Sequence, residues 1–145
     1  FDERFFCYFE DIDLAFRLRL LGHRCLYVPD AKVEHFGSAI AGRKSDFAVY
    51  YGHRNMVWAY VKNMPSSLLW FGLPQHILIN LAALIWYSLT GQAGTIFKAK
   101  RDALLGLRKT IAQRKSIQKN SRVSSKKIKK VMATFWLLPY LKNRA

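Results

Sequence analysis

The chain has 145 residues, enough for one modest domain, and it contains 24 Lys or Arg against only nine Asp or Glu. Residues 1–64 are nearly neutral, whereas residues 65–145 contain fifteen Lys or Arg and a single acid, an excess that attracts nucleic acid or an anionic membrane surface. The two cysteines form no CxxC pair and no metal-finger spacing, which argues against a zinc module, and we expect Cys7 and Cys25 to be buried, reduced thiols.

The first predicted helix runs from about residue 12 to residue 21. The apolar residues that share one of its faces are Leu14, Leu18 and Leu21. Asp11 is the expected N-cap and Gly22 the expected C-cap. Asp13 and Arg17 lie four residues apart, so we expect them to pair on the exposed side of this helix.

Two strands and a second helix are predicted next. Residues 23–29 have the pattern of a short strand closed by a proline, and residues 31–37 have the pattern of a second strand. Residues 38–45 are predicted to form a loop. The second helix fits residues 46–63 and ends before Pro65, with Arg54 and Asn55 expected to serve packing within it.

Residues 66–90 contain no Asp, Glu, Lys or Arg, and this length is sufficient to span a bilayer. However, Gly72, Pro74 and several polar residues interrupt the segment, and its clean apolar run, residues 77–89, is too short to span alone. A spanning helix, a re-entrant helix, an in-plane helix and a buried hairpin therefore all remain open.

The rest of the chain is basic. Residues 93–115 have the pattern of a basic amphipathic helix, which is typical of elements that lie on a membrane surface. Residues 116–130 are predicted to be a polar basic linker, and residues 131–141 form a second aromatic, apolar candidate for an anchor.

Glu10 and Asp11 stand out because they are adjacent acids among four aromatic residues. The dipole at a helix N-terminus stabilises one carboxylate, so a capping role is the simplest explanation for either acid alone. A carboxylate with apolar surroundings and a second carboxylate beside it takes up a proton more readily, which suits it to accept one from a hydroxyl group.

The acidic pair belongs to a longer pattern made of "FDE", "EDIDL" and "YVPDAKVEH", followed by a loop of small residues. Residues 1–64 with these motifs resemble the second half of the catalytic domain of family 2 glycosyltransferases, most closely the bacterial rhamnosyltransferase-like members. The resemblance implies an α/β fold class: the C-terminal part of a GT-A domain in residues 1–64, followed by an α-helical, membrane-associating region. We expect membrane-associated helices in residues 65–112, and a basic linker with a short apolar end in residues 113–145.

The resemblance also implies roles for individual residues. Asp11, or secondly Glu10, corresponds to the catalytic base, and His35 corresponds to a residue that helps to hold a divalent cation, Mg²⁺ or Mn²⁺, on the donor diphosphate. The loop residues expected near the diphosphate or the acceptor are Ser38, Arg43 and Lys44. Without the resemblance, His35 reads as a hydrogen-bonded histidine at a sheet edge, and the loop reads as solvated.

The function implied is an inverting glycosyltransferase at the cytoplasmic face of the cell membrane. It would move a sugar, with rhamnose suggested by the resemblance, from a nucleotide-diphosphate donor to a lipid-linked or cell-surface glycan acceptor. The chain has neither a DxD-type metal motif at a strand end nor a Gly-rich phosphate loop. We therefore expect a fragment that is inactive alone. The alternative is a basic module without catalysis that anchors to a membrane or, less favoured, binds nucleic acid.

Overall fold

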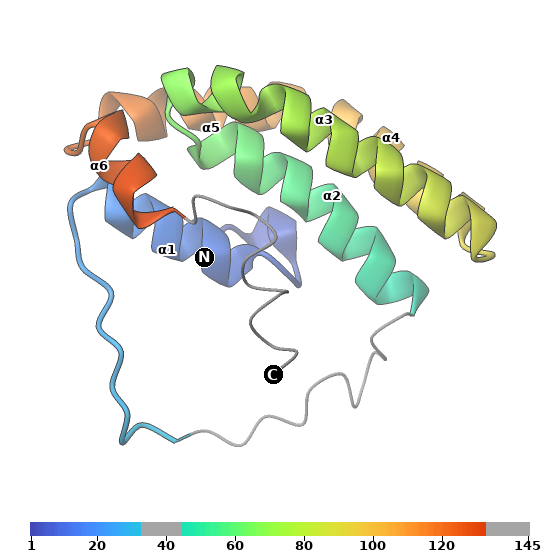
Figure 1. Cartoon of the computed structure of the whole chain (residues 1–145), viewed down its shortest axis with the longest axis horizontal. Helices are drawn as coiled ribbons and strands as arrows, with labels where there is room; N and C mark the ends of the chain where they lie inside the picture. The colour runs from blue at the N-terminus through green and yellow to red at the C-terminus, as the bar shows by residue number, and fades with distance from the viewer. Residues whose placement is uncertain (33–44, 133–145) are drawn as a thin grey trace.

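The computed structural model describes residues 1–32 and 45–132, and helices are the only regular secondary structure in these residues (Figure 1). The elements in chain order are the short 3₁₀ helix η1 (Glu3–Phe5) and the α-helices α1 (Glu10–Leu20), α2 (Asp46–Asn63), α3 (Ser66–Leu89), α4 (Ala93–Leu105), α5 (Leu107–Lys119) and α6 (Ser125–Val131).

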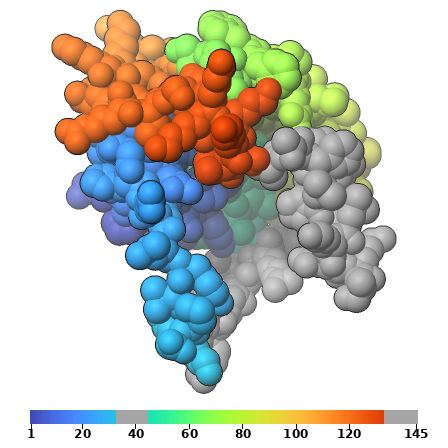
Figure 2. Space-filling model, turned by 60° about the vertical axis from the view of Figure 1, so that its left-hand side comes forward, coloured from blue at the N-terminus to red at the C-terminus, as the bar shows by residue number. Residues whose placement is uncertain are grey.

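The α/β prediction is wrong for the part of the chain that the structure describes. Residues 23–29, predicted to be a strand, have no regular secondary structure, and Tyr27 is 89% exposed. Figure 2 shows this segment, in light blue, projecting from the surface. An alternating apolar pattern becomes a strand only where a neighbouring strand pairs with its backbone, and no described residue provides that pairing. Most of the second predicted strand, residues 31–37, lies outside the described residues.

Helix α1 begins two residues earlier than predicted, and its N-cap is Phe9 rather than Asp11. Its end matches the prediction to within one residue. Gly22 follows the C-cap with a φ of 91°, which a glycine adopts without strain. The N–H groups of Gly22 and His23 donate to the carbonyl oxygens of Arg19 and Leu18, and these bonds form the motif that commonly ends helices.

Helix α2 is the centre of the structure, and its predicted bounds are confirmed. The Ser45 side chain caps it by accepting a hydrogen bond from the N–H of Ala48 at 3.2 Å. In Figure 1, α2 lies between α1 on one side and α3 on the other, while α4 and α5 also pack against it. The helix positioned at the centre therefore contacts every long helix of the described chain.

The predicted helix over residues 93–115 is in fact two helices, α4 and α5, that meet at Gly106. Trp58 of α2 packs against this junction, and its Nε1 donates to the carbonyl oxygen of Ala103 at 2.9 Å. A Cβ atom at Gly106 would lie 2.3 Å from the Trp58 ring, so the close approach requires glycine. On the other side, Trp58 meets Phe5 edge-on with ring centroids 6.2 Å apart.

Three further predictions need correction. Helix α3 continues through Pro74 without a break, so the residues expected to interrupt it do not. The predicted linker contains the end of α5 and the short helix α6, whose Ile128 is buried. Cys25 is exposed and Cys7 is only partly buried, so the expected burial of both thiols is wrong, although both are free.

Candidate functional site

The turn that leads into α1 is strained. Phe6, Tyr8 and Phe9 have φ angles of 61°, 66° and 68°, in a region that residues other than glycine rarely adopt. Such strain persists only where the surrounding structure enforces it, and it is concentrated at functional sites. The acidic pair Glu10 and Asp11 follows this turn directly, at the N-terminus of α1.

Helix α2 holds the strained turn through two adjacent side chains. Asn55 is fully buried, and its Nδ2 lies 2.8 Å from each of the carbonyl oxygens of Phe5, Cys7 and Tyr8. The Arg54 guanidinium donates to the carbonyl oxygen of Phe5 at 3.3 Å and to that of the preceding residue at 3.0 Å. The backbone carbonyls of a loop that cannot form helix or sheet bonds are thus satisfied by side chains.

Asp13 has a structural role, as its predicted partner Arg17 indicates, but it is buried rather than exposed. Its carboxylate accepts from Arg17 Nε at 2.9 Å, from Lys62 Nζ at 3.0 Å and from Asn63 Nδ2 at 2.8 Å. Lys62 also donates to Asp2 at 2.6 Å. This network fixes α1 against α2, so Asp13, expected on the exposed side of the helix from its spacing with Arg17, lies at the helix–helix contact.

Glu10 and Asp11 remain outside that network. Asp11 is exposed, and its Oδ1 accepts from the N–H of Ile12 at 2.7 Å. Glu10 is half-buried, and its Oε2 is buried without a hydrogen-bond partner among the described residues. A carboxylate oxygen in this situation is available to accept a hydrogen bond from a bound hydroxyl group.

A hollow of about 400 Å³ adjoins the two acids. Residues 7–12 form one wall, and Gly52 of α2 forms the other. The aromatic rings of Tyr8 and Phe47 lie 6.2 Å apart at this end of α2. The site therefore joins two carboxylates to an aromatic surface, an arrangement suited to a polar ligand with an apolar ring face.

The remaining predicted site residues lie outside the described residues. These are the predicted metal ligand His35 and the loop residues Ser38, Arg43 and Lys44. Within residues 1–32 and 45–132, no three His, Cys, Asp or Glu side chains gather into a possible metal site. Glu10 and Asp11 by themselves do not provide a set of ligands sufficient for Mg²⁺ or Mn²⁺.

Sequence reasoning assigned Arg54 and Asn55 to packing, which the structure confirms, but it missed the turn that they hold. A signal was present in α2. Asn55, Lys62 and Asn63 recur at a spacing that places them on one helix face, and all three are buried. A polar stripe on the inner face of a helix indicates partners elsewhere in the chain, and here these are the turn and Asp13.

Helix α3 is the second candidate feature. It is 24 residues long, an 18-residue stretch of it has a mean hydropathy of 1.6, and none of its residues is buried inside the molecule. By length and composition it is sufficient to cross a membrane, which is compatible with membrane association.

Comparisons with known proteins match a short stretch of the chain. Over 43 residues, 30% of this chain, it is 49% identical to N-acetylglucosaminyl-diphospho-decaprenol L-rhamnosyltransferase of Mycobacterium tuberculosis, in the CDC 1551 / Oshkosh strain and in the H37Rv strain. The stretch covers 14% of the length of each relative. No family model and no solved structure matches the chain. The chain is thus similar over part of its length to a glycosyltransferase, which supports a transferase function.

Proposed function

We propose that this chain is part of an inverting glycosyltransferase that moves a sugar from a nucleotide-diphosphate donor to a lipid-linked or cell-surface glycan. The observation on which this depends is the pair Glu10 and Asp11, presented beside a hollow by a strained turn. The partial similarity to an L-rhamnosyltransferase whose name includes a decaprenol-linked sugar supports rhamnose as the sugar and a lipid-linked acceptor.

The reaction needs a base at the acceptor. A carboxylate of the pair takes the proton from the acceptor hydroxyl, and that oxygen attacks the anomeric carbon of the donor sugar from the face opposite the diphosphate. The bond from the anomeric carbon to the diphosphate breaks, the diphosphate leaves with the electron pair, and the configuration is inverted. The sequence favours Asp11 as this base. Glu10 is nevertheless the first residue to test, because its Oε2 is buried and has no hydrogen-bond partner among the described residues.

The donor side of the site stays a proposal. Arg43, Lys44 and Ser38 would contact the diphosphate or the acceptor, since guanidinium, ammonium and hydroxyl groups donate hydrogen bonds to phosphate oxygens. His35 would help to hold Mg²⁺ or Mn²⁺. The described residues do not form a metal site by themselves.

The location that we propose is the cytoplasmic face of the cell membrane, where the basic, apolar second part would attach the enzyme to anionic lipid. An apolar helix combined with several cations provides the two signals that firm membrane attachment requires. Attachment at the membrane would bring the acidic pair near acceptors that are themselves anchored in lipid.

The test is sugar transfer by the full-length protein, using radiolabelled dTDP-rhamnose and a polyprenyl-diphosphate-linked N-acetylglucosamine as acceptor. Glu10→Gln and Asp11→Asn each remove one carboxylate without changing its size, and loss of the base is expected to lower the rate about 10²- to 10⁴-fold. Glu3→Gln is the matched control, because Glu3 is an exposed acid outside the hollow. Wild-type rates in both Glu10→Gln and Asp11→Asn would refute the proposed site.

A binding experiment with the same full-length protein distinguishes a membrane-attached enzyme from a nucleic-acid-binding module. Sedimentation with membranes in high salt supports the proposal, whereas salt-sensitive retention on DNA, without sugar transfer, would favour the nucleic-acid module.

A further inference from the structure

One face of helix α3 is attached to the rest of the molecule along its whole length. Near the start of α3, the hydroxyl of Tyr60 on α2 donates to the carbonyl oxygen of Leu69 at 2.6 Å. Two turns further on, the Tyr60 ring stacks on His76, with centroids 4.0 Å apart and an interplanar angle of 8°. The N-terminal half of α3 is therefore fixed against the end of α2.

The C-terminal half of α3 is attached in the same way. Asn80 accepts a hydrogen bond from the ammonium group of Lys100 on α4, and this ammonium group also donates to the carbonyl oxygen of His53 at 3.3 Å. The His53 ring meets Tyr87 edge-on at 4.9 Å. Residues 69, 76, 80 and 87 follow each other at helical spacing, so a single inner face of α3 makes all of these contacts.

The opposite face of α3 is apolar, and the described residues leave it exposed. Its residues are Phe71, Leu78, Ile85 and Leu89, which are 78%, 67%, 62% and 81% exposed. We call these four residues the outer stripe. Trp70 and Trp86 flank it and are also exposed, and aromatic residues of this kind are enriched at the boundary between membrane and water. An exposed apolar surface of this extent indicates an interaction site.

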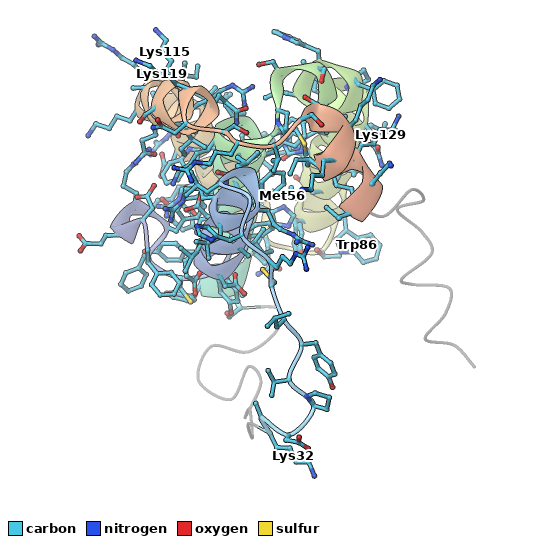
Figure 3. The ribbon with its side chains drawn as sticks, turned by 90° about the vertical axis from the view of Figure 1, so that its left-hand side faces the viewer. Lys32, Met56, Trp86, Lys115, Lys119 and Lys129 are labelled. Carbon is cyan, nitrogen blue, oxygen red and sulfur yellow. The ribbon has the colours of Figure 1, made fainter. Side chains whose placement is uncertain are left out.

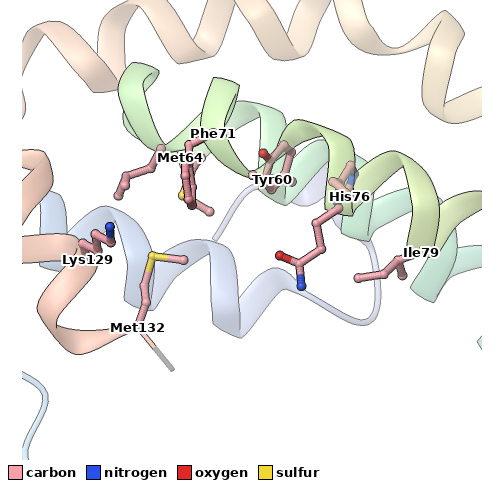
Figure 4. A pocket seen from close by; sticks show the side chains of 10 residues that line it. Tyr60, Met64, Phe71, His76, Ile79, Lys129 and Met132 are labelled. Carbon is pink, nitrogen blue, oxygen red and sulfur yellow. The ribbon is translucent and has the colours of Figure 1, made fainter. Parts of the chain in front are cut away.

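One cation lies beside the outer stripe, and further lysines belong to the same short helix. The Lys129 ammonium group of α6 lies 5.2 Å from the centroid of the Phe71 ring (Figure 4). Figure 3 shows Lys129 and Trp86 on the same side of the molecule. The other lysines of α6 are exposed as well, namely Lys126, Lys127 and Lys130. Apolar residues bordered by lysines complement a bilayer with anionic headgroups.

These contacts argue against a membrane-spanning orientation of α3. Because the inner face of α3 is attached at both halves, α2 and α4 would have to enter the bilayer beside it. Those helices contain Arg54, Lys62, Lys100 and Arg101, and charged side chains at the bilayer centre are costly. An orientation parallel to the membrane surface leaves these groups in the protein or in water.

We infer that α3 lies in the plane of an anionic bilayer, with the outer stripe among the acyl chains and the α6 lysines at the headgroups. This inference depends on the membrane attachment in the proposed function, and it specifies the face that binds lipid.

The first test asks whether the two ends of α3 lie on one side of the membrane. The full-length protein is prepared in sealed inverted membrane vesicles with Ser67→Cys or Thr90→Cys, both of which replace exposed residues. A membrane-impermeant maleimide is added, and labelling of each position is read by peptide mass spectrometry. Ser116→Cys, at an exposed position of α5, reports on the side that the reagent reaches.

Labelling of Ser67→Cys and Thr90→Cys to the extent of Ser116→Cys supports the in-plane orientation. Labelling at one end only would show a span, which overturns this inference and leaves membrane attachment intact. Absence of the protein from the membranes would overturn the attachment itself, and transfer to a water-soluble acceptor would then show whether the enzymatic proposal survives.

The second test measures binding of the protein to vesicles of phosphatidylglycerol and phosphatidylcholine. Leu78→Asp places a charge in the outer stripe and is expected to weaken binding about tenfold or more. Leu26→Asp is the matched control, because Leu26 is an exposed leucine outside α3. Equal binding of the two variants would overturn the assignment of the outer stripe to lipid.

Discussion

Replacing Asn55 with alanine removes the group that holds the strained turn before α1. Its two N–H bonds serve three backbone carbonyls, each 2.8 Å from Nδ2, and the side chain is fully buried. A buried polar group that loses its partner costs about 1–3 kcal/mol, so two lost donors predict a decrease of roughly 2–6 kcal/mol in the free energy of unfolding. Relaxation of the strained Tyr8 and Phe9 would offset part of this cost.

Urea unfolding followed by far-UV circular dichroism measures this change, with stability obtained from the midpoint and the slope. Asn120→Ala is the matched control, because Asn120 is exposed at the end of α5 and is expected to change stability by less than about 0.5 kcal/mol. In the full-length protein, Asn55→Ala should also slow sugar transfer, because Glu10 would lose its fixed position. A cost below about 1 kcal/mol would contradict the role assigned to Asn55.

Three further predictions concern buried or partly buried charges. Lys62→Ala removes one of the positive charges that pair with the buried Asp13 carboxylate, so the free energy of unfolding should decrease by about 3 kcal/mol. Lys115→Ala, at the surface, should change it little, and equal stability of the two variants would contradict the network. Burial raises the pKa of Asp2, but the hydrogen bond and the charge of Lys62 outweigh this effect and lower the pKa below 3.8. The free energy of unfolding should therefore decrease as the pH drops below about 4, and Lys62→Ala should weaken that pH dependence. Burial lowers the pKa of Lys100 to about 8, so above that pH the unfolded chain binds more protons than the folded chain. Thermal stability should therefore rise between about pH 8 and 10.5 in the wild type but not in Lys100→Met.

Local sequence patterns correctly predicted structure that is determined by residues close together in the chain. Helix α2 has a capping serine, a continuous helical pattern and a proline just beyond its end, and its bounds were predicted without error. The pairing of Asp13 with Arg17 follows from their spacing alone and was also correct. Both cases depend on contacts between residues that are close in the chain.

Predictions failed where distant residues decide the structure. The break at Gly106 depends on Trp58, which lies nearly fifty positions earlier and leaves no room for a side chain there. The burial of Asp13 depends on Lys62 of another helix. Residues 23–29 have the composition of a strand, but a strand requires a partner that the described residues do not supply.

The candidate site was predicted only in part. The acidic pair was identified from its sequence neighbours, whereas the strained turn that presents it depends on Arg54 and Asn55 of α2. No pattern in residues 1–11 indicates that Tyr8 and Phe9 take left-handed φ angles, because these angles are imposed by contacts with α2.

The most direct test of the central claim, that a carboxylate beside the hollow takes the acceptor proton, is the pH dependence of kcat/KM for sugar transfer by the full-length protein. The wild type should lose activity at low pH as the base becomes protonated, and the Glu10→Gln or Asp11→Asn variant that lacks the base should be slow and show no such loss. Retention of the wild-type rate and of its low-pH decrease in both variants would contradict the account.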